Sequence, residues 1–392
     1  MLEVGVVGGG LMGMATSYFL LRSGRCRVTL YDASLRRPVT GYSACASSVA
    51  GGLLHPLTPR LKPAWEATEA LRKADELVRE AERAAKTSLV TTDVVLRPAI
   101  DDDDAITLQA AAADRPEWLE WLEPDAFIKT SGRADLDRGG VRYIGGRCVD
   151  PRGYLDALRV LNEQAGEFSV VEEAVDPRSL EHAETILCGG ADAFRKFPEL
   201  FPGGLTLTRG ESLVYDGSTT NGPALLRGSY LCPGANGLIL GATHEHFDDS
   251  KAAVDAPPRA PEVLRAGGLR EAADLLAAPG AAIKGATAGV RLNGPRTHLG
   301  RLPFAFRHEE GLWVAGGLGA RGFLRHAQLG EVVARAVVGD GDVPPALELA
   351  LKRMRARERK RARAVESARA CSKTDDHTDG AGCVSYLSQI SG

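Results

Sequence analysis

Three glycines near the N-terminus have the spacing of a phosphate-binding turn. Gly8, Gly10 and Gly13 form the pattern G-x-G-x-x-G between a β-branched run, Glu3–Val7, and a helix-like run over 14–21. The first glycine permits a tight turn, the second lets backbone amides approach a pyrophosphate, and the third lets the helix pack closely on the strand. The pattern predicts a dinucleotide site whose contacts are Gly8, Gly10, Leu11, Met12 and Gly13.

A carboxylate stands where such a site binds ribose. The next strand-like run, 27–31, ends in Asp32, roughly twenty residues after the glycines, the usual distance for an acid that accepts hydrogen bonds from the ribose diol. An acid here favours an unphosphorylated ribose, and therefore NAD or FAD over NADP. The alternative interpretation is that the glycines form only a structural turn.

A loop of small residues lies between this strand and an amphipathic helix. The segment 46–56 reads A-S-S-V-A-G-G-L-L-H-P and shows no helical period. Small side chains and exposed amides suit the close approach of a flat ring or a pyrophosphate. Ser47, Gly52 and Leu53 are the candidate contacts, and His55 could donate to the ring or to a substrate. Taken by itself, such a segment could equally be a flexible surface loop.

Composition describes an ordinary globular chain with one unusual segment. The 392 residues carry a net charge of −3, but the range 352–363 holds eight basic residues and one acid. Seven scattered cysteines indicate reduced thiols in an intracellular protein, cytoplasmic or organellar, and argue against a disulfide framework or a structural zinc site. No apolar run approaches the ~20 residues of a membrane span, and no presequence is visible, so we expect a soluble protein without a metal.

These segments together resemble the FAD-dependent D-amino-acid oxidase superfamily. That family includes glycine oxidase, sarcosine oxidase and the oxidase domain of the bifunctional enzyme that modifies a 5-carboxymethylaminomethyl-2-thiouridine in tRNA. The loop 46–56 is most similar to the last group, whose pattern is A-S-G-N-x-x-G-A-L-Y-P. Ser47, Gly52, Leu54 and Pro56 match it, whereas Ser48, Val49 and His55 depart from it.

The resemblance continues to about residue 340 and implies further cofactor contacts. The run 170–175 resembles a strand whose last residue, Val175, contacts the adenine side of FAD through its backbone. The run 311–323 is similar to a strand, glycine loop and helix whose N-terminus faces the pyrimidine carbonyls of the flavin. The implied contacts in that run are Gly317, Gly319, Arg321, Gly322 and Phe323.

Two residues occupy positions that hold the substrate in this family. Arg291, in A-G-V-R, would bind a substrate carboxylate through its fork-shaped guanidinium, and Tyr230, in Y-x-x-P, would form another wall. A surface arginine and a core tyrosine are the structural alternatives. The chain departs from the family at Gly300, where an aspartate is usual, and in the short connection 176–184, where a β-hairpin is usual.

The expected fold is α/β, with a Rossmann-like FAD-binding domain interleaved with an α+β substrate domain built on a mixed sheet. The FAD-binding domain is expected in three pieces, 1–60, 141–204 and 286–340. The substrate domain is expected over 61–140 and 205–285. Residues 341–392 are expected to form a basic helix and a disordered tail.

The resemblance implies an FAD-dependent enzyme that oxidises the C–N bond of an amino acid or glycine-like secondary amine. Hydride would pass to flavin N5 and dioxygen would reoxidise the flavin, which we expect to be bound non-covalently because no cysteine lies near Arg291. One alternative is oxidation of a carboxymethylaminomethyl uridine in tRNA, with the basic run Lys352–Arg363 as an RNA contact. Another is a non-catalytic flavin-containing assembly factor. An NAD-dependent dehydrogenase would leave the glycine loop 316–323 unexplained.

Overall fold

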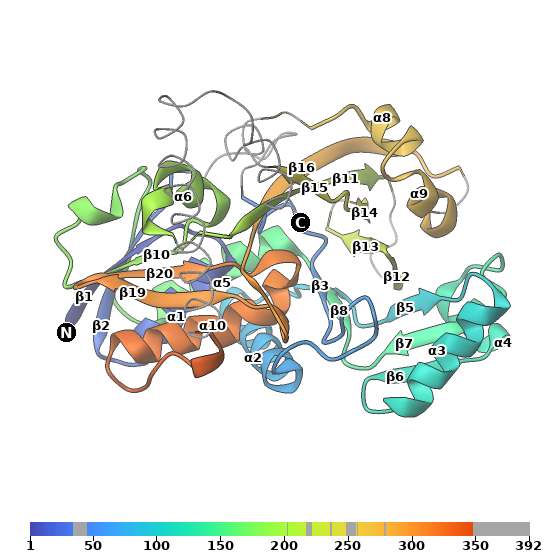
Figure 1. Cartoon of the computed structure of the whole chain (residues 1–392), viewed down its shortest axis with the longest axis horizontal. Coiled ribbons are helices and arrows are strands. Elements are labelled where there is room, and N and C mark those ends of the chain that lie inside the picture. Colours follow the sequence, from blue (N-terminus) through green and yellow to red (C-terminus); the bar gives the residue numbers. More distant parts are fainter. Residues whose placement is uncertain are drawn as a thin grey trace, which may run out of the picture.

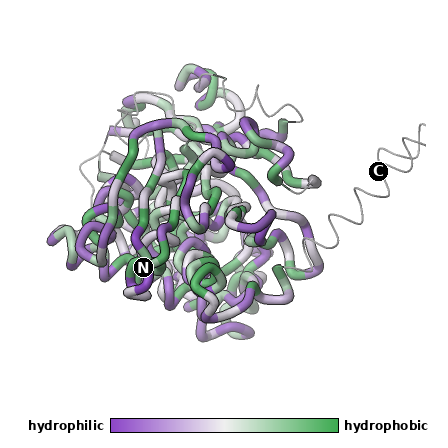
Figure 2. Tube along the Cα trace, turned by 90° about the vertical axis from the view of Figure 1, so that its left-hand side faces the viewer, coloured by the Kyte–Doolittle hydropathy of each residue, from purple (hydrophilic) through white to green (hydrophobic). Residues whose placement is uncertain are grey.

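Two large β-sheets stand side by side and divide the described chain between them (Figure 1). The computed structural model describes residues 1–33, 45–201, 203–216, 222–235, 237–247, 256, 258–277 and 280–347. No helix in these ranges is both long and apolar enough to cross a membrane. Hydrophobic and hydrophilic stretches alternate along the helices and strands (Figure 2), as expected for elements that bury one face.

The first sheet has six strands in the order β19-β20-β10-β1-β2-β9. Its central strands are parallel, and only β19 runs antiparallel to its neighbour β20. Val4 and Val6 of β1 are fully buried, as the β-branched run 3–7 predicts. The strands are β1 (Leu2–Val7), β2 (Cys26–Tyr31), β9 (Phe168–Val171), β10 (Glu184–Leu187), β19 (Phe304–Glu309) and β20 (Leu312–Gly316).

Helices cover both faces of this sheet. On one face α1, α2, α5 and α10 pack into a single apolar core, and on the other α6 and a short 3-10 helix, η2, pack with phenylalanines of β19. Helix α5 begins with Pro151, and the Asp150 carboxylate accepts a hydrogen bond from the Gly153 amide at 3.0 Å, a standard N-cap. These elements are α1 (Leu11–Arg22), α2 (Ala67–Ala85), α5 (Pro151–Ala165), α6 (Gly190–Lys196), η2 (Pro198–Leu200) and α10 (Gly322–Val337).

The second sheet has nine strands and is mostly antiparallel. Its order is β15-β11-β14-β13-β12-β5-β7-β6, with β16 paired along the full length of β11. Helices α8 (Pro261–Ala266) and α9 (Arg270–Leu276) pack on one part of it, and α3 (Asp102–Asp114) and α4 (Pro124–Ser131) on another. The strands are β5 (Val95–Pro98), β6 (Leu119–Leu122), β7 (Gly140–Tyr143), β11 (Thr206–Tyr215), β12 (Ala224–Arg227), β13 (Ser229–Gly234), β14 (Gly237–Gly241), β15 (Glu245–Phe247) and β16 (Ile283–Asn293).

Smaller elements connect the two sheets. A three-stranded sheet has the order β3-β8-β4, and a tight hairpin, β17–β18, follows β16. Two short 3-10 helices lie within the unit of the six-stranded sheet, η1 between β9 and β10 and η3 between β20 and α10. The bounds are β3 (Leu53–Leu54), β4 (Val90–Thr92), β8 (Arg147–Val149), β17 (Arg296–Thr297), β18 (Gly300–Arg301), η1 (Pro177–Ser179) and η3 (Gly319–Arg321).

The strand pairing moves three of the expected boundaries. Strands β7 and β16 belong to the nine-stranded sheet, whereas the sequence places 141–204 and 286–340 in the FAD-binding domain. The reason is their pairing, since β7 pairs with β5 and β6, and β16 pairs with β11. At the C-terminus, Val343, Ala346 and Leu347 pack on the core of the six-stranded sheet, so the tail does not start at 341. The basic helix and disordered tail expected after this point lie outside the described residues.

Two glycines with the same backbone conformation allow a matched stability test. Gly24 has φ +69° and nothing within 4 Å of a Cβ added to it, whereas Gly52 has φ +71° and an added Cβ would lie 1.8 Å from the Val149 carbonyl oxygen. We expect Gly24→Ala to cost about 1–2 kcal/mol, the strain of a left-handed residue. Gly52→Ala should cost at least ~1–3 kcal/mol more, because the backbone must also move apart.

Urea unfolding of the wild type and both variants measures this difference in the free energy of unfolding. Equal losses in the two variants would show that the close approach of Gly52 to Val149 does not constrain the fold.

Candidate functional site

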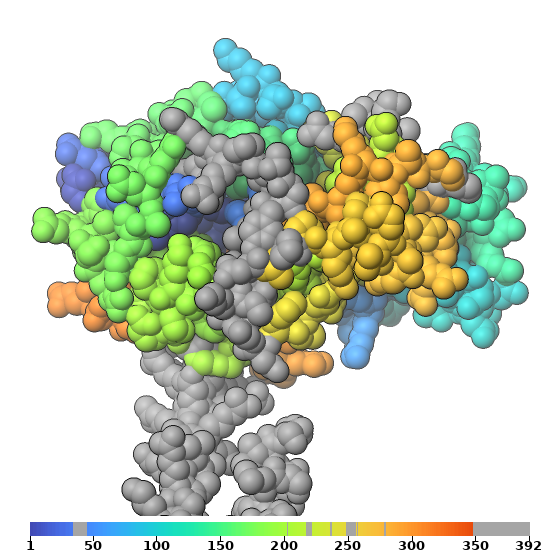
Figure 3. Space-filling view, turned by 90° about the horizontal axis from the view of Figure 1, so that it is seen from above, coloured from blue at the N-terminus to red at the C-terminus, as the bar shows by residue number. Residues whose placement is uncertain are grey.

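The glycine turn between β1 and α1 is fixed by close backbone contacts. Gly8 has φ +111°, and an added Cβ would lie 2.6 Å from the Cα atom of Gly189. An added Cβ at Gly13 would lie 1.8 Å from the Gly8 carbonyl oxygen. The first and third glycines therefore have the roles that the motif predicts. Figure 3 shows N-terminal residues, in blue, at the bottom of a hollow beside green segments that include α6.

Two polar side chains from outside the turn converge on its amides. The Gly9 amide donates to Asp32 Oδ2 at 2.6 Å, and the Leu11 amide donates to Ser47 Oγ at 3.1 Å. Gly10 is the N-cap of α1, and an added Cβ would lie 3.0 Å from the same Ser47 oxygen. The structure thus brings together Asp32, Ser47 and the glycine turn, which are up to 39 positions apart in sequence.

The loop after Cys45 passes between the two sheets. Cys45 forms a parallel bridge with Val290 of β16, and an added Cβ at Gly289 would lie 2.5 Å from Val49 Cγ2. At Gly51 an added Cβ would lie 2.2 Å from the ring of Tyr230. Leu53 then pairs with Cys148 in the three-stranded sheet. The small residues of this loop are therefore a packing requirement between the sheets, and not a sign of a free surface loop.

The glycine loop before α10 leads back to the start of α1. Gly317 and Gly319 have φ values of +72° and +59°. Gly322 starts α10, and an added Cβ there would lie 3.4 Å from Leu11 Cδ1, so the first residues of α10 and α1 are in contact. Phe323 is buried against Tyr154, with ring centroids 5.8 Å apart. Arg321 lies at the end of η3, where its Nη2 donates to the Leu57 carbonyl at 3.1 Å.

The expected strand 170–175 is shorter in the structure. Strand β9 ends at Val171, where its pairing with β2 ends at Tyr31, and Val175 lies in the loop before η1. The prediction of Val175 as a strand terminus is wrong, because Glu172, Glu173 and Ala174 are exposed and pair with no strand among the described residues. A contact between its backbone and adenine stays a prediction.

Arg291 and Tyr230, the two predicted substrate residues, come together beside the loop 46–56. Arg291 on β16 is largely buried, and burial lowers the pKa of its guanidinium while Tyr230 opposes the shift. Burial also raises the pKa of the Tyr230 phenol, with Ser212 and Arg291 acting in the opposite direction. Among the described residues no carboxylate forms an ion pair with Arg291. Its guanidinium is therefore available to an acidic ligand.

The segment 243–246 forms another side of this site. Arg291 Nη2 lies 3.5 Å from the Thr243 carbonyl oxygen, at the limit of a hydrogen bond, and 3.1 Å from a Cβ added to Gly210. His244 follows, and burial together with the Arg291 charge lowers the pKa of its imidazole. His246 pairs instead with Thr208, at 3.3 Å. The described residues contain no group of three metal-binding side chains.

A buried ionic network holds this segment in place. Glu211 Oε1 accepts from Arg209 Nη2 at 2.8 Å, and Glu211 Oε2 accepts from Arg259 Nε at 2.5 Å. The backbones of Glu211 and Thr243 also bond, with the Thr243 amide donating to the Glu211 carbonyl at 3.0 Å. Arg259 further pairs with Glu245. No local pattern could have predicted Arg259, which is 48 positions from Glu211.

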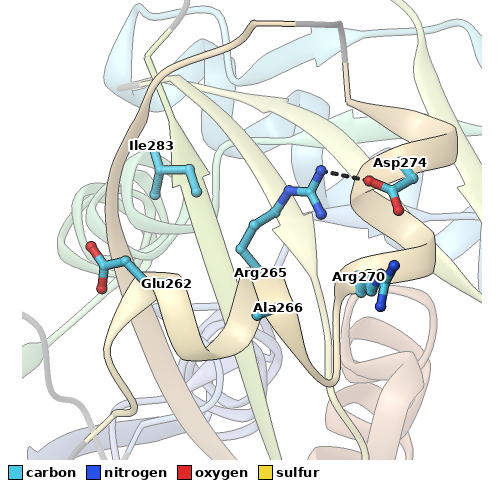
Figure 4. A pocket seen from close by; sticks show the side chains of 6 residues that line it. All are labelled: Glu262, Arg265, Ala266, Arg270, Asp274 and Ile283. Carbon is cyan, nitrogen blue, oxygen red and sulfur yellow. Dashed lines mark hydrogen bonds and ion pairs between the residues drawn. The ribbon is translucent and has the colours of Figure 1, made fainter.

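A hollow elsewhere on the surface has no part in this arrangement. It lies on α8 and α9, and Arg265 Nη2 in its centre lies 2.5 Å from Asp274 Oδ1 (Figure 4). That ion pair neutralises the guanidinium, and none of the predicted site residues is present. The lining residues are Glu262, Arg265, Ala266, Arg270, Asp274 and Ile283.

The fold and this site define a flavin-dependent oxidoreductase. A family model described as FAD dependent oxidoreductase (DAO) matches residues 3–336, and the chain belongs to that family. The predicted family, fold class and FAD cofactor are thereby confirmed, and the alternative of an NAD-dependent dehydrogenase is excluded.

Two curated relatives are bifunctional proteins of tRNA modification. The chain is 27% identical over 340 residues to "tRNA 5-methylaminomethyl-2-thiouridine biosynthesis bifunctional protein MnmC" of Maricaulis maris, covering 86% of this chain and 52% of that protein. It is 27% identical over 358 residues to the protein of the same name from Caulobacter sp., covering 86% and 54%. The chain thus spans about half the length of these relatives.

Solved structures share the fold over nearly their whole length. Glycine oxidase from Geobacillus kaustophilus superposes with a TM-score of 0.65 at 21% identity, covering 88% of this chain and 96% of that one. Iminodiacetate oxidase from Chelativorans sp. gives 0.67 at 21% identity, covering 87% and 97%. These likenesses concern the fold.

The residues present fit FAD. The turn around Gly10 offers amides and the Ser47 hydroxyl to a pyrophosphate, Asp32 offers a carboxylate to a ribose, and a glycine loop leads into the N-terminus of α10. Two buried atoms near that N-terminus, His55 Nδ1 and Arg321 Nε, have no hydrogen-bond partner in the described part of the chain. Unpartnered buried polar atoms at a site commonly mark the place of a ligand.

Replacing Glu211 tests the ionic network. Burial alone would raise its pKa, but hydrogen bonds from Arg209 and Arg259 outweigh burial and hold the pKa below its ordinary value. Glu211→Gln leaves a buried arginine unpaired and should cost about 3–5 kcal/mol of unfolding free energy at pH 7. Glu245→Gln removes a partly exposed partner of Arg259 and should cost about 0–1 kcal/mol.

The pH dependence follows from the sign of that shift. The ionised Glu211 stabilises the fold fully above the ordinary glutamate pKa of about 4.3, and this contribution is lost as the pH falls through the lowered folded value. Urea unfolding from pH 7 to pH 3 should therefore show the gap between wild type and Glu211→Gln narrowing in acid. A constant gap would contradict the network.

Proposed function

We propose that this protein oxidises the C–N bond of an amino acid or a glycine-like secondary amine. The observation that carries the proposal is the buried guanidinium of Arg291, which lacks a carboxylate partner among the described residues and lies beside Tyr230 at the loop expected to contact the cofactor. When bound, FAD supplies the hydride acceptor, flavin N5, and is reoxidised by dioxygen. The chain must supply binding and orientation.

Arg291 is suited to hold the carboxylate of the substrate. A guanidinium donates two parallel hydrogen bonds to a carboxylate, and in a buried site each is stronger than in water. Its charge is not neutralised by another described side chain, so an acidic ligand gains the full interaction. We assign Arg291 the carboxylate and Tyr230 the adjacent wall, where its ring packs on Gly51 and its hydroxyl faces Ser212.

The proposed hydride transfer requires no side-chain base. Hydride leaves the α-carbon of a neutral amine, so an ammonium must lose its proton first. His244 lies beside Arg291, and the lowered pKa of its imidazole keeps it neutral at physiological pH. Because this imidazole is neutral, it adds no second positive charge next to the amine of the substrate.

Substitution of Arg291 tests the proposal. Purified protein should be yellow, with flavin absorbance between about 350 and 500 nm, and amino acids should bleach it without oxygen. Arg291→Gln should weaken the apparent affinity for a carboxylate-bearing amine about 10- to 100-fold, the loss of charge-assisted hydrogen bonds of roughly 1.5–3 kcal/mol. Arg270→Gln, an exposed cation on α9, is the matched control.

Two outcomes would count against this function. A protein without bound flavin would overturn it altogether. Flavin that stays oxidised with every amine, yet raises the thermal unfolding temperature, would favour the alternative of a non-catalytic flavin-containing assembly factor.

A second candidate substrate is a carboxymethylaminomethyl uridine in tRNA. It is supported by the 27% identity to two proteins named for tRNA 5-methylaminomethyl-2-thiouridine biosynthesis. The side chain of such a uridine ends in a glycine-like secondary amine, so the same site would serve. Lys352–Arg363, outside the described residues, is the candidate RNA contact, and an intracellular location, cytoplasmic or organellar, belongs to this proposal.

Neutralising the positive charges of Lys352–Arg363 distinguishes between the two candidate substrates. If tRNA is the substrate, changing the eight basic residues of 352–363 to glutamine should weaken tRNA binding and reduce its salt dependence, because phosphate contacts dominate such binding. Bleaching of the flavin by free amino acids should not change. Failure of the intact protein to bind tRNA, measured by filter binding, would remove this candidate.

A further inference from the structure

Two short segments next to the proposed site carry exposed cations. The loop 57–63 reads L-T-P-R-L-K-P and directly follows the loop 46–56, and the segment 294–301 reads G-P-R-T-H-L-G-R and directly follows β16. Within the described ranges none of these cations forms an ion pair with a carboxylate. The four exposed cations are Arg60 and Lys62 in the loop, and Arg296 and Arg301 in the second segment.

The loop 57–63 is a tight turn that its own backbone holds. The Thr58 amide donates to the Lys62 carbonyl at 2.7 Å, and the Leu61 amide donates to the Thr58 carbonyl at 2.8 Å. Leu61 has φ +57° and is only 5% exposed, because its side chain belongs to an apolar core of the nine-stranded sheet. Its two neighbours in sequence, Arg60 and Lys62, are left at the surface. The turn therefore presents these two cations on a fixed support.

Arg296 and Arg301 lie directly opposite each other in the hairpin β17–β18. Side chains at such positions start roughly 5 Å apart, and like charges there are destabilising. Burial and then the charge of Arg296 lower the pKa of Arg301. The segment 294–301 contains no acid, and glycine occupies position 300, where an aspartate is usual in the family. The positive charge of the hairpin is therefore not balanced from within it.

The start of α10 holds both segments. Arg321 Nη2 donates to the Leu57 carbonyl at 3.1 Å, and Arg325 Nη1 donates to the Arg301 carbonyl at 2.7 Å. The two anchoring arginines are one helical turn apart, ~6 Å along the axis, so the loop and the hairpin are fixed close to each other. We call their four exposed cations the cationic face: Arg60, Lys62, Arg296 and Arg301.

The charge of the cationic face favours a polyanion as its partner. Glu66, an exposed acid near α10, accepts a hydrogen bond from Gln328 and pairs with none of the four cations. The C-terminal part of this chain does not suit the face, since 352–363 holds eight basic residues and one acid. A nucleic acid carries one negative phosphate per nucleotide, and exposed arginine and lysine side chains bind such phosphates.

The position of the cationic face favours a nucleic acid that is itself the substrate. Arg296 follows Arg291 by a few residues, and Arg60 follows His55 in the same way. The two segments that carry the cations are therefore direct continuations of β16 and of the loop 46–56, which we assign to the site. A strand bound on this face would lie next to that site.

We propose that the cationic face binds the phosphate backbone of an RNA substrate and so places its modified nucleotide beside Arg291. The proposal rests on the second candidate of the proposed function, a carboxymethylaminomethyl uridine in tRNA. It assigns RNA contacts to residues of the described structure, in addition to the run 352–363. Phosphate contacts position a nucleic acid without reading its sequence, so the face supplies affinity and orientation.

The salt dependence of tRNA binding by the flavin-loaded full chain is the primary readout. One double variant combines Arg296→Gln with Arg301→Gln, and the other combines Arg60→Gln with Lys62→Gln. Each removes two phosphate contacts, so each should bind bulk tRNA about tenfold more weakly. The slope of log K against log salt should become less steep by about 1.4–1.8 in each.

A matched control removes two exposed cations from another part of the molecule. Arg270 on α9 and Lys284 at the start of β16 are exposed, and neither has an ion pair in the part of the chain that the structure describes. Arg270→Gln combined with Lys284→Gln should change neither the affinity nor the slope.

One hydrogen bond calls for a second variant. Arg301 Nη1 also donates to the Thr206 hydroxyl at 3.2 Å, so its replacement can loosen the hairpin. If the hairpin variant lowers the thermal unfolding temperature, Arg296→Gln alone keeps the test, because its side chain makes no hydrogen bond in the described structure. This single variant should make the slope less steep by about 0.7–0.9.

Three results would overturn the proposal. One is a wild-type protein that does not bind tRNA, and another is a slope in both double variants that equals the slope of the control. The third is binding of poly-glutamate as tight as binding of an RNA of equal charge, which would assign the cationic face to an acidic protein.

Reduction of the flavin by free amino acids tests the proposed function separately. All of these variants should be reduced at the wild-type rate, because none of the changed residues is assigned to the site. Slopes that fall as expected in a protein whose flavin no amine reduces would overturn the proposed function and leave the RNA contact in place.

Discussion

The segment 45–56 fits between two sheets because glycines within it and on β16 leave room for close contacts. At Gly51 a side chain would enter the ring of Tyr230, at Gly52 it would enter the Val149 carbonyl, and at Gly289 it would enter Val49. One short loop thereby touches strands of both sheets. Its Ser47 hydroxyl accepts a hydrogen bond from the first amide of α1, so the predicted cofactor turn and the proposed wall of the substrate site both contact this loop.

The arginines near the site differ in whether a carboxylate pairs with them. Arg209 and Arg259 are balanced by Glu211 and Glu245, and their charges serve to hold a chain segment. Arg325 is buried and Arg291 and Arg321 are half-buried, and among the described residues none of the three forms an ion pair with a carboxylate. Because an unpaired buried charge destabilises the fold, these three positions are where binding of an anion would give the largest gain.

The local sequence predicts the cofactor turn, but it predicts little of the structure around that turn. The order strand, glycines, helix, strand and acid fixes Gly8, Gly13 and Asp32 relative to one another, because each connection is short. The pairing partner of β16 could not be read in the same way, since a β-branched run indicates a strand but does not say which sheet it joins. Arg259 and Arg325 lie in unremarkable helical or loop sequence, and their burial depends on chain segments far away in sequence.

The departure at Gly300 has a conformational reason. This residue has φ +92° in the tight hairpin β17–β18, a region that an aspartate seldom adopts. The Arg301 carbonyl next to it accepts a hydrogen bond from Arg325. A glycine therefore suits this hairpin better than the aspartate that is usual in the family.

The packing of Val343, Ala346 and Leu347 on the first core sets where the chain can be shortened. A deletion that begins at 341 would remove apolar side chains from the layer that also holds α1 and α10, and would expose that layer to water. Loss of flavin in such a shortened protein would then report a breached core instead of a role for the basic run. A deletion that begins after Leu347 keeps these three side chains in place.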